Sequence, residues 1–232
     1  MEAIVLAGGF GTRLRPVVSD VPKPMAPVGG RPFLEHLVGY WIEQGVRRFV
    51  VSVGYLAERI VDYFGSAWRG AEFAYAREQT PLGTGGGLLL ALDEVTSPRV
   101  LVLNGDSFFR VVLAEALAFH QSRNADCSLN LFRSRDTRRY LGLDLEDNGR
   151  VRSFSAPGDA VTALVNGGVY LFRTATLRAL PWKSGERASL EADILPHGMS
   201  AGWRIYGREC RGAFIDIGVP EDYARAAEVM QA

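Results

Sequence analysis

Lysine is scarce in this 232-residue chain: Lys23 and Lys183 are the two lysines among 26 basic residues, which 26 acidic residues balance to a formal charge of zero. Because there is no excess of positive charge, we expect neither a surface that binds nucleic acid nor one that binds an anionic membrane. The sequence also has no apolar run long enough to cross a bilayer and no recognisable signal peptide. We therefore expect a cytoplasmic protein.

Cysteine and histidine are equally sparse. Cys127 and Cys210 lie far apart in the sequence and match no zinc-binding or redox spacing, so neither a disulfide nor a zinc site is expected. His36, His120 and His197 are scattered, and we assign them no chemistry.

The chain does have the alternating pattern of an α/β protein. A length of 232 residues with 47% hydrophobic content is enough for one large domain with a substantial core. Strand-like runs lie at residues 49–53, 100–103, 128–132 and 169–172, and helical patterns at residues 32–44 and 113–123. The alternation predicts a single Rossmann-like domain, with a mostly parallel mixed sheet flanked by helices.

A glycine-rich segment follows the first strand-like run. Residues 3–6 are apolar, too few for a helix and bounded by glycines, which is typical of a buried strand. Gly8, Gly9 and Gly11 come next, and without a Cβ atom they let main-chain N–H groups approach a phosphate or the edge of a base.

Two cationic side chains follow this turn. Arg13 can bind phosphate oxygens through two nitrogens, and Lys23 adds a compact charge from a segment stiffened by Pro22 and Pro24. A dinucleotide fingerprint would need glycine where Leu14 stands, and a P-loop would need Gly-Lys-Ser/Thr at its end. The alternative, a glycine turn that only joins a strand to a loop, leaves both cations unexplained. The segment therefore indicates a nucleoside triphosphate site.

Residues 6–14 and 22–25 resemble the signature of the sugar-1-phosphate nucleotidyltransferases, Leu-Ala-Gly-Gly-x-Gly-Thr-Arg-Leu followed by Pro-Lys-Pro-Met. The similarity continues at residues 81–86, 104–106, 166–170 and 216–223. It implies one nucleotidyltransferase domain over residues 1–232, with a nucleotide-binding part up to about residue 110 and a sugar-phosphate-binding part from about 111 to 232. The β-helix of longer family members is not expected, because no short repeat is present.

The resemblance also implies a nucleotide site built from the glycine turn and from residues 78–86. A helix start capped by Thr84 is compatible with that role. The implied nucleotide-binding residues are Leu6, Ala7, Gly8, Gly9, Gly11, Thr12, Arg13, Lys23, Glu78, Gly83 and Thr84.

Two aspartates end apolar strand-like runs, Asp106 after residues 100–103 and Asp216 after residues 213–215. A carboxylate at such a place needs a hydrogen bond, an ion pair or a cation, and Mg²⁺ binds one or two carboxylates together with phosphates; a turn-forming aspartate is the alternative. The resemblance implies that both bind Mg²⁺ and that Arg13, Lys23 and Asp106 are catalytic. The implied reaction is attack of a sugar 1-phosphate on the α-phosphorus of the nucleotide, without a protein nucleophile.

For the sugar 1-phosphate, the resemblance implies five binding residues: Gly142, Asn166, Gly168, Glu191 and Asp193. An acid-rich helix start is the alternative reading of Glu191 and Asp193. Many relatives carry Glu-Lys-Pro before the Asn-Gly-Gly motif, whereas residues 154–157 read Phe-Ser-Ala-Pro here. Either sugar-phosphate affinity is weak or an arginine replaces that lysine. The candidates are Arg133, Arg135, Arg138, Arg139 and Arg152.

The loop at residues 81–86 resembles the guanylyltransferase branch of the family and favours GTP. The whole pattern most resembles the D-glycero-α-D-manno-heptose-1-phosphate guanylyltransferases, which make GDP-heptose for surface polysaccharide (capsule, lipopolysaccharide or S-layer glycan). Alternatives are the mannose-1-phosphate guanylyltransferases, the N-acetylmuramate-1-phosphate uridylyltransferases and a non-catalytic nucleotide-sensing paralogue. The expected partners are GTP, a sugar 1-phosphate and Mg²⁺, with a homodimer as one option for assembly.

Overall fold

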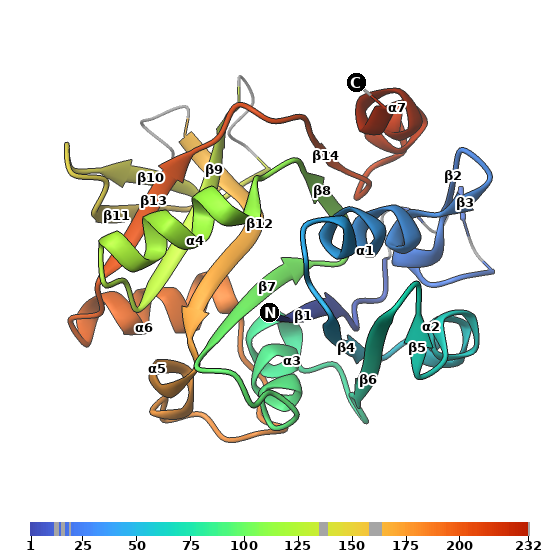
Figure 1. Cartoon of the computed structure of the whole chain (residues 1–232), viewed down its shortest axis with the longest axis horizontal. Helices are drawn as coiled ribbons and strands as arrows, with labels where there is room; N and C mark the ends of the chain where they lie inside the picture. Colours follow the sequence, from blue (N-terminus) through green and yellow to red (C-terminus); the bar gives the residue numbers. More distant parts are fainter. Residues whose placement is uncertain (12–13, 15–16, 19, 135–138, 158–163, 232) are drawn as a thin grey trace.

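A mixed sheet crosses the middle of the molecule (Figure 1). The computed structural model describes residues 1–11, 14, 17–18, 20–134, 139–157 and 164–231. Within these residues the sheet has ten strands: β1 (Glu2–Ala7), β4 (Arg48–Val53), β5 (Ala67–Trp68), β6 (Ala71–Arg77), β7 (Arg99–Asn104), β9 (Cys127–Arg133), β10 (Gly142–Leu145), β11 (Val151–Ser155), β12 (Leu164–Arg173) and β13 (Ile205–Glu209).

The centre of the sheet is parallel. Strand β1 lies between β4 and β7, and Leu6 pairs with Ser52 on one side and with Asn104 on the other. β6 continues the parallel part beside β4, while β12 runs antiparallel to β7 and carries β9 and β10. Because β1, β4, β6 and β7 run the same way, their carboxyl ends meet at one edge, where ligands of such sheets bind.

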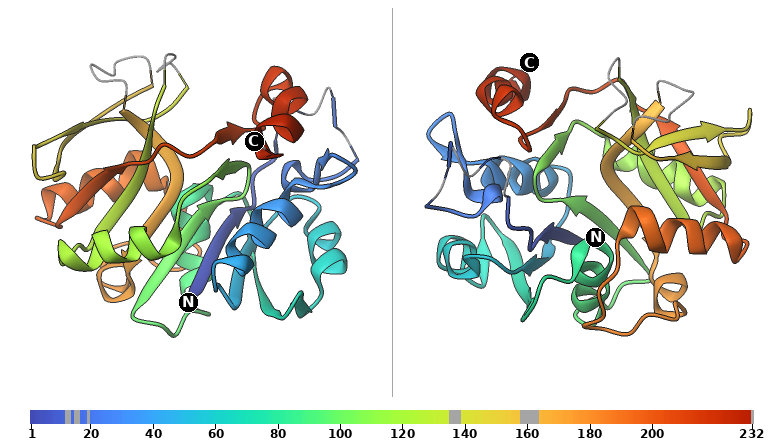
Figure 2. Two further views of the ribbon diagram at one scale, coloured as in Figure 1. Left: turned by 45° about the horizontal axis from the view of Figure 1, so that its top comes forward. Right: turned by 180° about the vertical axis from the view of Figure 1, so that it is seen from behind.

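Two apolar cores cover the opposite faces of the sheet. Successive side chains of β1 point to opposite faces of the sheet, so Ala3 and Val5 belong to one core and Ile4 to the other. The near face in Figure 1 carries α4 and α1, and the right view of Figure 2 shows α6 on the opposite face. The first core takes residues from α1 (Phe33–Glu43), α2 (Ala57–Phe64), α4 (Leu113–Ser122) and α7 (Pro220–Gln231); the second takes residues from α3 (Gly83–Leu92), α5 (Thr174–Arg178), the π-helical turn η2 (Leu190–Ile194) and α6 (Leu195–Ser200).

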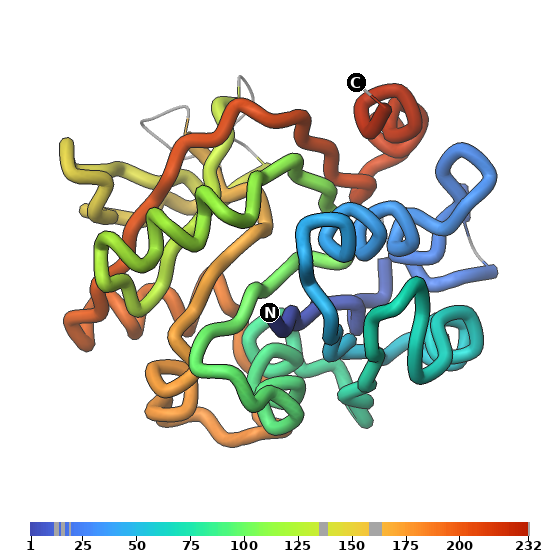
Figure 3. The backbone as a smooth tube through the Cα atoms, viewed as in Figure 1, coloured from blue at the N-terminus to red at the C-terminus, as the bar shows by residue number. Residues whose placement is uncertain are grey.

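The C-terminal segment returns to the N-terminal half of the chain. Figure 3 shows it crossing from β13 to α7, and Tyr223 on α7 donates a hydrogen bond to the carbonyl of Pro27 at 2.6 Å. On the way it forms the short strand β14 (Phe214–Asp216), antiparallel to β8 (Ser107–Phe109). Asp216 lies opposite Ser107 in this pair, so the return brings it next to Asp106. The other short elements are η1 (Lys23–Met25), β2 (Pro27–Val28) and β3 (Arg31–Pro32).

The predicted α/β domain with a mixed sheet flanked by helices is confirmed. The four strand-like runs at residues 49–53, 100–103, 128–132 and 169–172 each lie within an observed strand, the run at 213–215 overlaps β14, and the two predicted helices correspond to α1 and α4. Among the described residues, none of the helices has the length and apolar character to span a membrane. The division into a nucleotide part and a sugar-phosphate part stays a prediction.

Candidate functional site

A cavity of about 390 Å³ opens at the carboxyl edge of the parallel strands. The turn after β1 and the turn after β7 form its floor, and the amide of Gly105 donates to the carbonyl of Leu6 at 2.9 Å, which fixes the two turns side by side. The lining residues are Leu6, Ala7, Gly8, Gly9, Phe10, Gly11, Lys23, Pro24, Glu78, Pro81, Gly83, Thr84, Gly87, Asn104, Asp106, Arg187 and Gly218.

The structure brings the described members of the predicted nucleotide site together. Leu6, Ala7, Gly8, Gly9, Gly11, Lys23, Glu78, Gly83 and Thr84 all line this one cavity. Thr12 and Arg13 lie outside the described residues. The cavity joins the turn after β1 to the N-terminus of α3, as the sequence predicted for a nucleotide.

Glu78 follows β6 and places its carboxylate beside the glycine turn. Oε1 accepts a hydrogen bond from the Ser52 hydroxyl at 2.9 Å, and Oε2 accepts one from the Leu82 amide at 3.0 Å. A Cβ atom on Gly8 would lie 1.9 Å from Oε1, so glycine is required there for the carboxylate to reach the cavity. Glu78 is thus a fixed acceptor with both oxygens held from the protein side.

Lys23 lies between two carboxylates. Its Nζ is 2.5 Å from Asp106 Oδ2 and 3.5 Å from Asp216 Oδ1, and its side chain is 10% exposed. The Cβ atom of Lys23 would approach within 2.9 Å of a Cβ on Gly11, whose φ of +59° also favours glycine. The glycine turn therefore makes room for the lysine as well as for Glu78.

The surroundings of Asp216 disfavour the charged form of its carboxyl group. Burial and then the neighbouring Asp106 carboxylate raise the pKa of Asp216 above its ordinary value, while Lys23, the Gly218 amide and Arg139 oppose the rise. Arg139 reaches Asp216 Oδ2 at 3.2 Å and also pairs with Asp222 in the first turn of α7. Two neighbouring carboxylates, one of them largely buried, that need this much positive charge nearby are the arrangement in which a divalent cation would bind.

The donor set suits Mg²⁺ better than zinc. Over the ranges that the structure covers, no three His, Cys, Asp or Glu side chains gather into a metal-binding group, so Asp106 and Asp216 stand as a pair. Two carboxylates with open space for phosphates and water are the usual protein contribution to a Mg²⁺ site, whereas zinc sites use more protein ligands.

The predicted sugar side includes a hydrogen-bonded group next to the cavity. Asn166 donates through Nδ2 to the Tyr170 hydroxyl, which donates to Glu191 Oε1, and the Thr84 hydroxyl donates to Glu191 Oε2. The Gly168 amide donates to Asn166 Oδ1 at 3.1 Å. Asn166, Gly168 and Glu191 therefore lie together, and Thr84 connects them to the nucleotide side.

The other two predicted sugar residues take no part in these hydrogen bonds, and none of the five lines the described cavity. Gly142 begins β10 and pairs with Val165, the residue that precedes Asn166. Asp193 is exposed and does not line the cavity. Its carboxylate accepts a hydrogen bond from the Ser189 amide at 2.7 Å, and the Ser189 hydroxyl accepts one from the Ala192 amide. This reciprocal pair caps the start of η2, which is the alternative role expected for an acid there.

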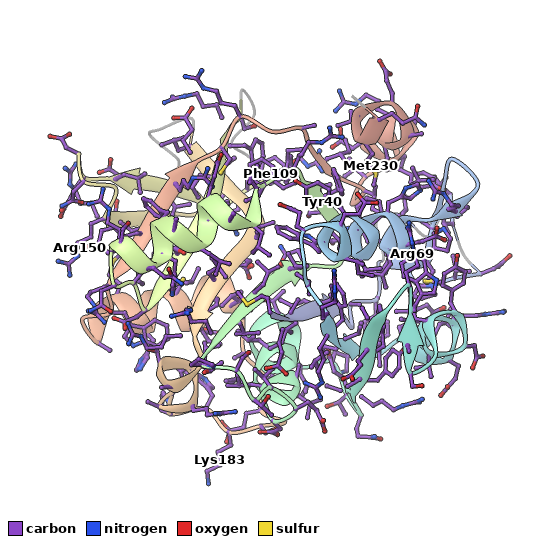
Figure 4. All side chains as sticks on the ribbon, viewed as in Figure 1. Tyr40, Arg69, Phe109, Arg150, Lys183 and Met230 are labelled. Carbon is purple, nitrogen blue, oxygen red and sulfur yellow. The ribbon has the colours of Figure 1, made fainter. Side chains whose placement is uncertain are left out.

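Sequence reasoning missed Arg187. Arg133 pairs with Glu209, Arg139 with Asp216 and Asp222, and Arg152 with Asp144, while Arg135 and Arg138 lie outside the described residues. Lys183 is exposed and extends outward (Figure 4). Arg187 instead lines the cavity and forms no ion pair with any residue that the structure describes. Backbone hydrogen bonds between Ala188 and residues 82–86 place it there. The one available signal in the sequence was its position four residues before Glu191, a predicted sugar residue.

Known proteins resemble this chain in sequence and in fold. A model of the nucleotidyl transferase family matches residues 2–232. D-glycero-alpha-D-manno-heptose 1-phosphate guanylyltransferase of Aneurinibacillus thermoaerophilus is 38% identical over 231 residues, covering 100% of this chain and 99% of that protein. The Campylobacter jejuni protein of the same name is 36% identical, covering 96% of this chain and 97% of its own length. The crystal structure of HddC from Yersinia pseudotuberculosis complexed with GMP-PN superposes with a TM-score of 0.84 at 31% identity, covering 98% of both chains.

Proposed function

Since the chain belongs to the nucleotidyl transferase family, we propose that it transfers GMP from GTP to a sugar 1-phosphate, with D-glycero-α-D-manno-heptose 1-phosphate as the sugar substrate. The observation that carries this proposal is the cavity lined by the glycine turn, Glu78, Lys23 and Asp106, with the second aspartate, Asp216, beside Lys23. The full-length similarity to two heptose-1-phosphate guanylyltransferases supports the choice of base and sugar.

Glu78 supports guanine as the base. Guanine presents two adjacent donors, the ring N1–H and the exocyclic amine, and a carboxylate can accept from both. Uracil and thymine present a single N–H between two carbonyl oxygens, which a carboxylate would repel on either side. The Ser52 and Leu82 hydrogen bonds fix Glu78 in place before the nucleotide arrives, which lowers the cost of ordering it.

Asp106 and Asp216 are the residues that would hold Mg²⁺ in this proposal. The raised pKa of Asp216 and its closeness to Asp106 show two acids whose repulsion a divalent cation would relieve. When bound, Mg²⁺ would neutralise phosphate charge at the reacting centre. Lys23 lies 10% exposed beside both carboxylates and offsets the negative charge of the nucleotide from the other side of the same site.

Arg187 supplies the charge for the sugar phosphate in place of the lysine that many relatives carry. It is the cation in the described cavity lining that no carboxylate neutralises, because Lys23 is already engaged by two. A guanidinium can bind two phosphate oxygens at once and holds its charge throughout the neutral range.

The reaction itself needs no nucleophile from the protein. One oxygen of the sugar 1-phosphate forms a bond to the α-phosphorus of GTP, the bond from that phosphorus to the bridging oxygen breaks, and pyrophosphate leaves. The contribution of the chain is to hold two polyanions in line and to offset their repulsion. Lys23 and Arg187 provide that charge from the described part of the cavity, and Arg13 remains a proposed third cation.

We further propose that the enzyme works in the cytoplasm and that its GDP-heptose product feeds surface-polysaccharide synthesis. The family similarity supports a biosynthetic role, and a homodimer is the assembly we propose to test first by light scattering.

Pyrophosphate release tests the proposal. The purified protein is incubated with Mg²⁺ and each pairing of GTP, ATP, UTP or dTTP with heptose, mannose, glucose or N-acetylmuramate 1-phosphate. The expected result is one dominant signal, at GTP with heptose 1-phosphate. A dominant signal at GTP with mannose 1-phosphate would change the sugar, and GTP binding without turnover on any sugar would indicate a sensing protein instead.

A further inference from the structure

A chain of hydrogen bonds joins the nucleotide side of the cavity to strand β12. The Thr84 hydroxyl at the start of α3 donates to Glu191 Oε2 at 2.8 Å. Tyr170 donates through its hydroxyl to Glu191 Oε1 at 2.9 Å and accepts from Asn166 Nδ2 at 2.5 Å. Thr84 lines the cavity, so the chain runs from the cavity wall into the core. Tyr170 is its buried midpoint.

The surroundings of Tyr170 fix the direction of its hydrogen bond to Glu191. Its side chain is fully buried in the second core, and burial followed by the Glu191 charge raises the pKa of its phenol well above the ordinary value of 10.0. The hydroxyl therefore stays protonated and donates a hydrogen bond to Glu191. Its oxygen lone pair is then available to accept the hydrogen bond from Asn166. A phenylalanine at this position would keep the packing and remove both hydrogen bonds.

Glu191 depends on these hydroxyls for its orientation. No described lysine, arginine or histidine forms an ion pair with it, and its oxygens accept from Tyr170, Thr84 and, at 3.5 Å, from the Ser189 hydroxyl. Neutral donors orient a carboxylate without cancelling its charge, so Glu191 keeps lone pairs that can accept hydrogen bonds from the hydroxyl groups of a sugar.

We propose that Tyr170 is a positioning residue for the sugar 1-phosphate: its hydroxyl holds Glu191 and Asn166 in the orientation in which both bind the sugar. The proposal rests on the sugar-1-phosphate guanylyltransferase function proposed above. Tyr170 is fully buried and its hydroxyl is engaged by Asn166 and Glu191, so it acts through these two partners rather than by contact with the substrate.

The test is Tyr170→Phe with full steady-state kinetics for both substrates. Losing the hydroxyl frees two polar groups that bind the sugar, so KM for the sugar 1-phosphate is expected to rise about tenfold to a hundredfold. KM for GTP and kcat at saturation should each stay within about threefold, because Tyr170 itself is not part of the cavity lining. Tyr75→Phe is the matched control, since its hydroxyl donates to the Gly65 carbonyl away from the cavity and its loss should leave both KM values unchanged.

Thr84→Val provides a second route if Tyr170→Phe does not fold, as judged by circular dichroism. It removes the other hydroxyl that orients Glu191, so a rise in the sugar KM is expected here too; because Thr84 also lines the cavity, KM for GTP is not a control for this variant. An unchanged sugar KM in a folded Tyr170→Phe enzyme, or a change confined to GTP in Thr84→Val, would overturn the positioning role. A wild-type protein without turnover would instead overturn the proposed function, so the two failures are distinguishable.

Discussion

Replacing Glu78 by Gln tests how the cavity selects its base. The two side chains have the same shape, and the Leu82 amide still requires an acceptor at the position of Oε2. The new NH₂ group is therefore forced to the position of Oε1, where the buried Ser52 hydroxyl can turn to accept from it. In the proposed complex, the acceptor that faces the guanine donors becomes a donor, while the fold is kept.

The magnitude follows from the hydrogen bonds that are lost. A bond to a charged acceptor contributes about 1.5–3 kcal/mol, so kcat/KM for GTP should fall about tenfold to a hundredfold. Inosine triphosphate isolates one of these bonds, because it lacks the exocyclic amine of guanine. The wild-type enzyme should prefer GTP over inosine triphosphate, and the variant should lose most of that preference.

The assay is continuous pyrophosphate release with GTP and inosine triphosphate at a saturating sugar 1-phosphate. Glu72→Gln is the matched control, since it lies on the same strand β6 with its side chain 77% exposed. Equal ratios of the two kcat/KM values in the wild type and in Glu78→Gln would refute base reading by Glu78.

Three further outcomes are expected. Lys23→Met should lower kcat about a hundredfold to a thousandfold in the same assay, because it removes the charge that faces both Asp106 and Asp216. Thermal unfolding of the variant should stay cooperative, and a change in kcat of only a few-fold would contradict the role of Lys23. Arg187→Gln should raise KM for the sugar 1-phosphate about tenfold, whereas Arg152→Gln, which breaks only an exposed pair with Asp144, should not. His120 should make stability pH-dependent, since burial and then the charges of Arg99 and Arg173 lower its pKa from 6.5 to about 4. The unfolded chain binds this proton first as the pH falls, so about 3 kcal/mol of the free energy of unfolding is lost between pH 6.5 and about 4; urea unfolding should show this loss in the wild type and not in His120→Gln.

Features that depend on short stretches of sequence could be predicted. The glycine turn follows a buried parallel strand, and the end of such a strand fixes where Gly8 and Gly11 lie. Asp106 lies at the same edge for the same reason, because it follows β7, the parallel neighbour of β1. The approach of Asp216 to Asp106 follows from the antiparallel pairing of β14 with β8, which the sequence pattern alone does not specify.

The arginine that we propose for the sugar phosphate could not be predicted from composition or spacing. Arg139 was a reasonable candidate, but it is committed to Asp216 and Asp222, and such pairing depends on how α7 returns to the sheet. Arg187 reaches the cavity because Ala188 accepts backbone hydrogen bonds from Gly85 and Gly86 at the start of α3. Both placements result from tertiary contacts between segments far apart in the sequence. The roles of these residues remain predictions.

The fate of the α-phosphate of GTP tests the central claim most directly. GTP labelled with ³²P at the α-position is incubated with the protein, Mg²⁺ and heptose 1-phosphate, and the products are separated by anion-exchange chromatography. Nucleotidyl transfer predicts that the label moves into a GDP-sugar in amounts equal to the pyrophosphate released, and only when the sugar phosphate is present. Label recovered as GMP or GDP, or label that stays in GTP, would contradict it.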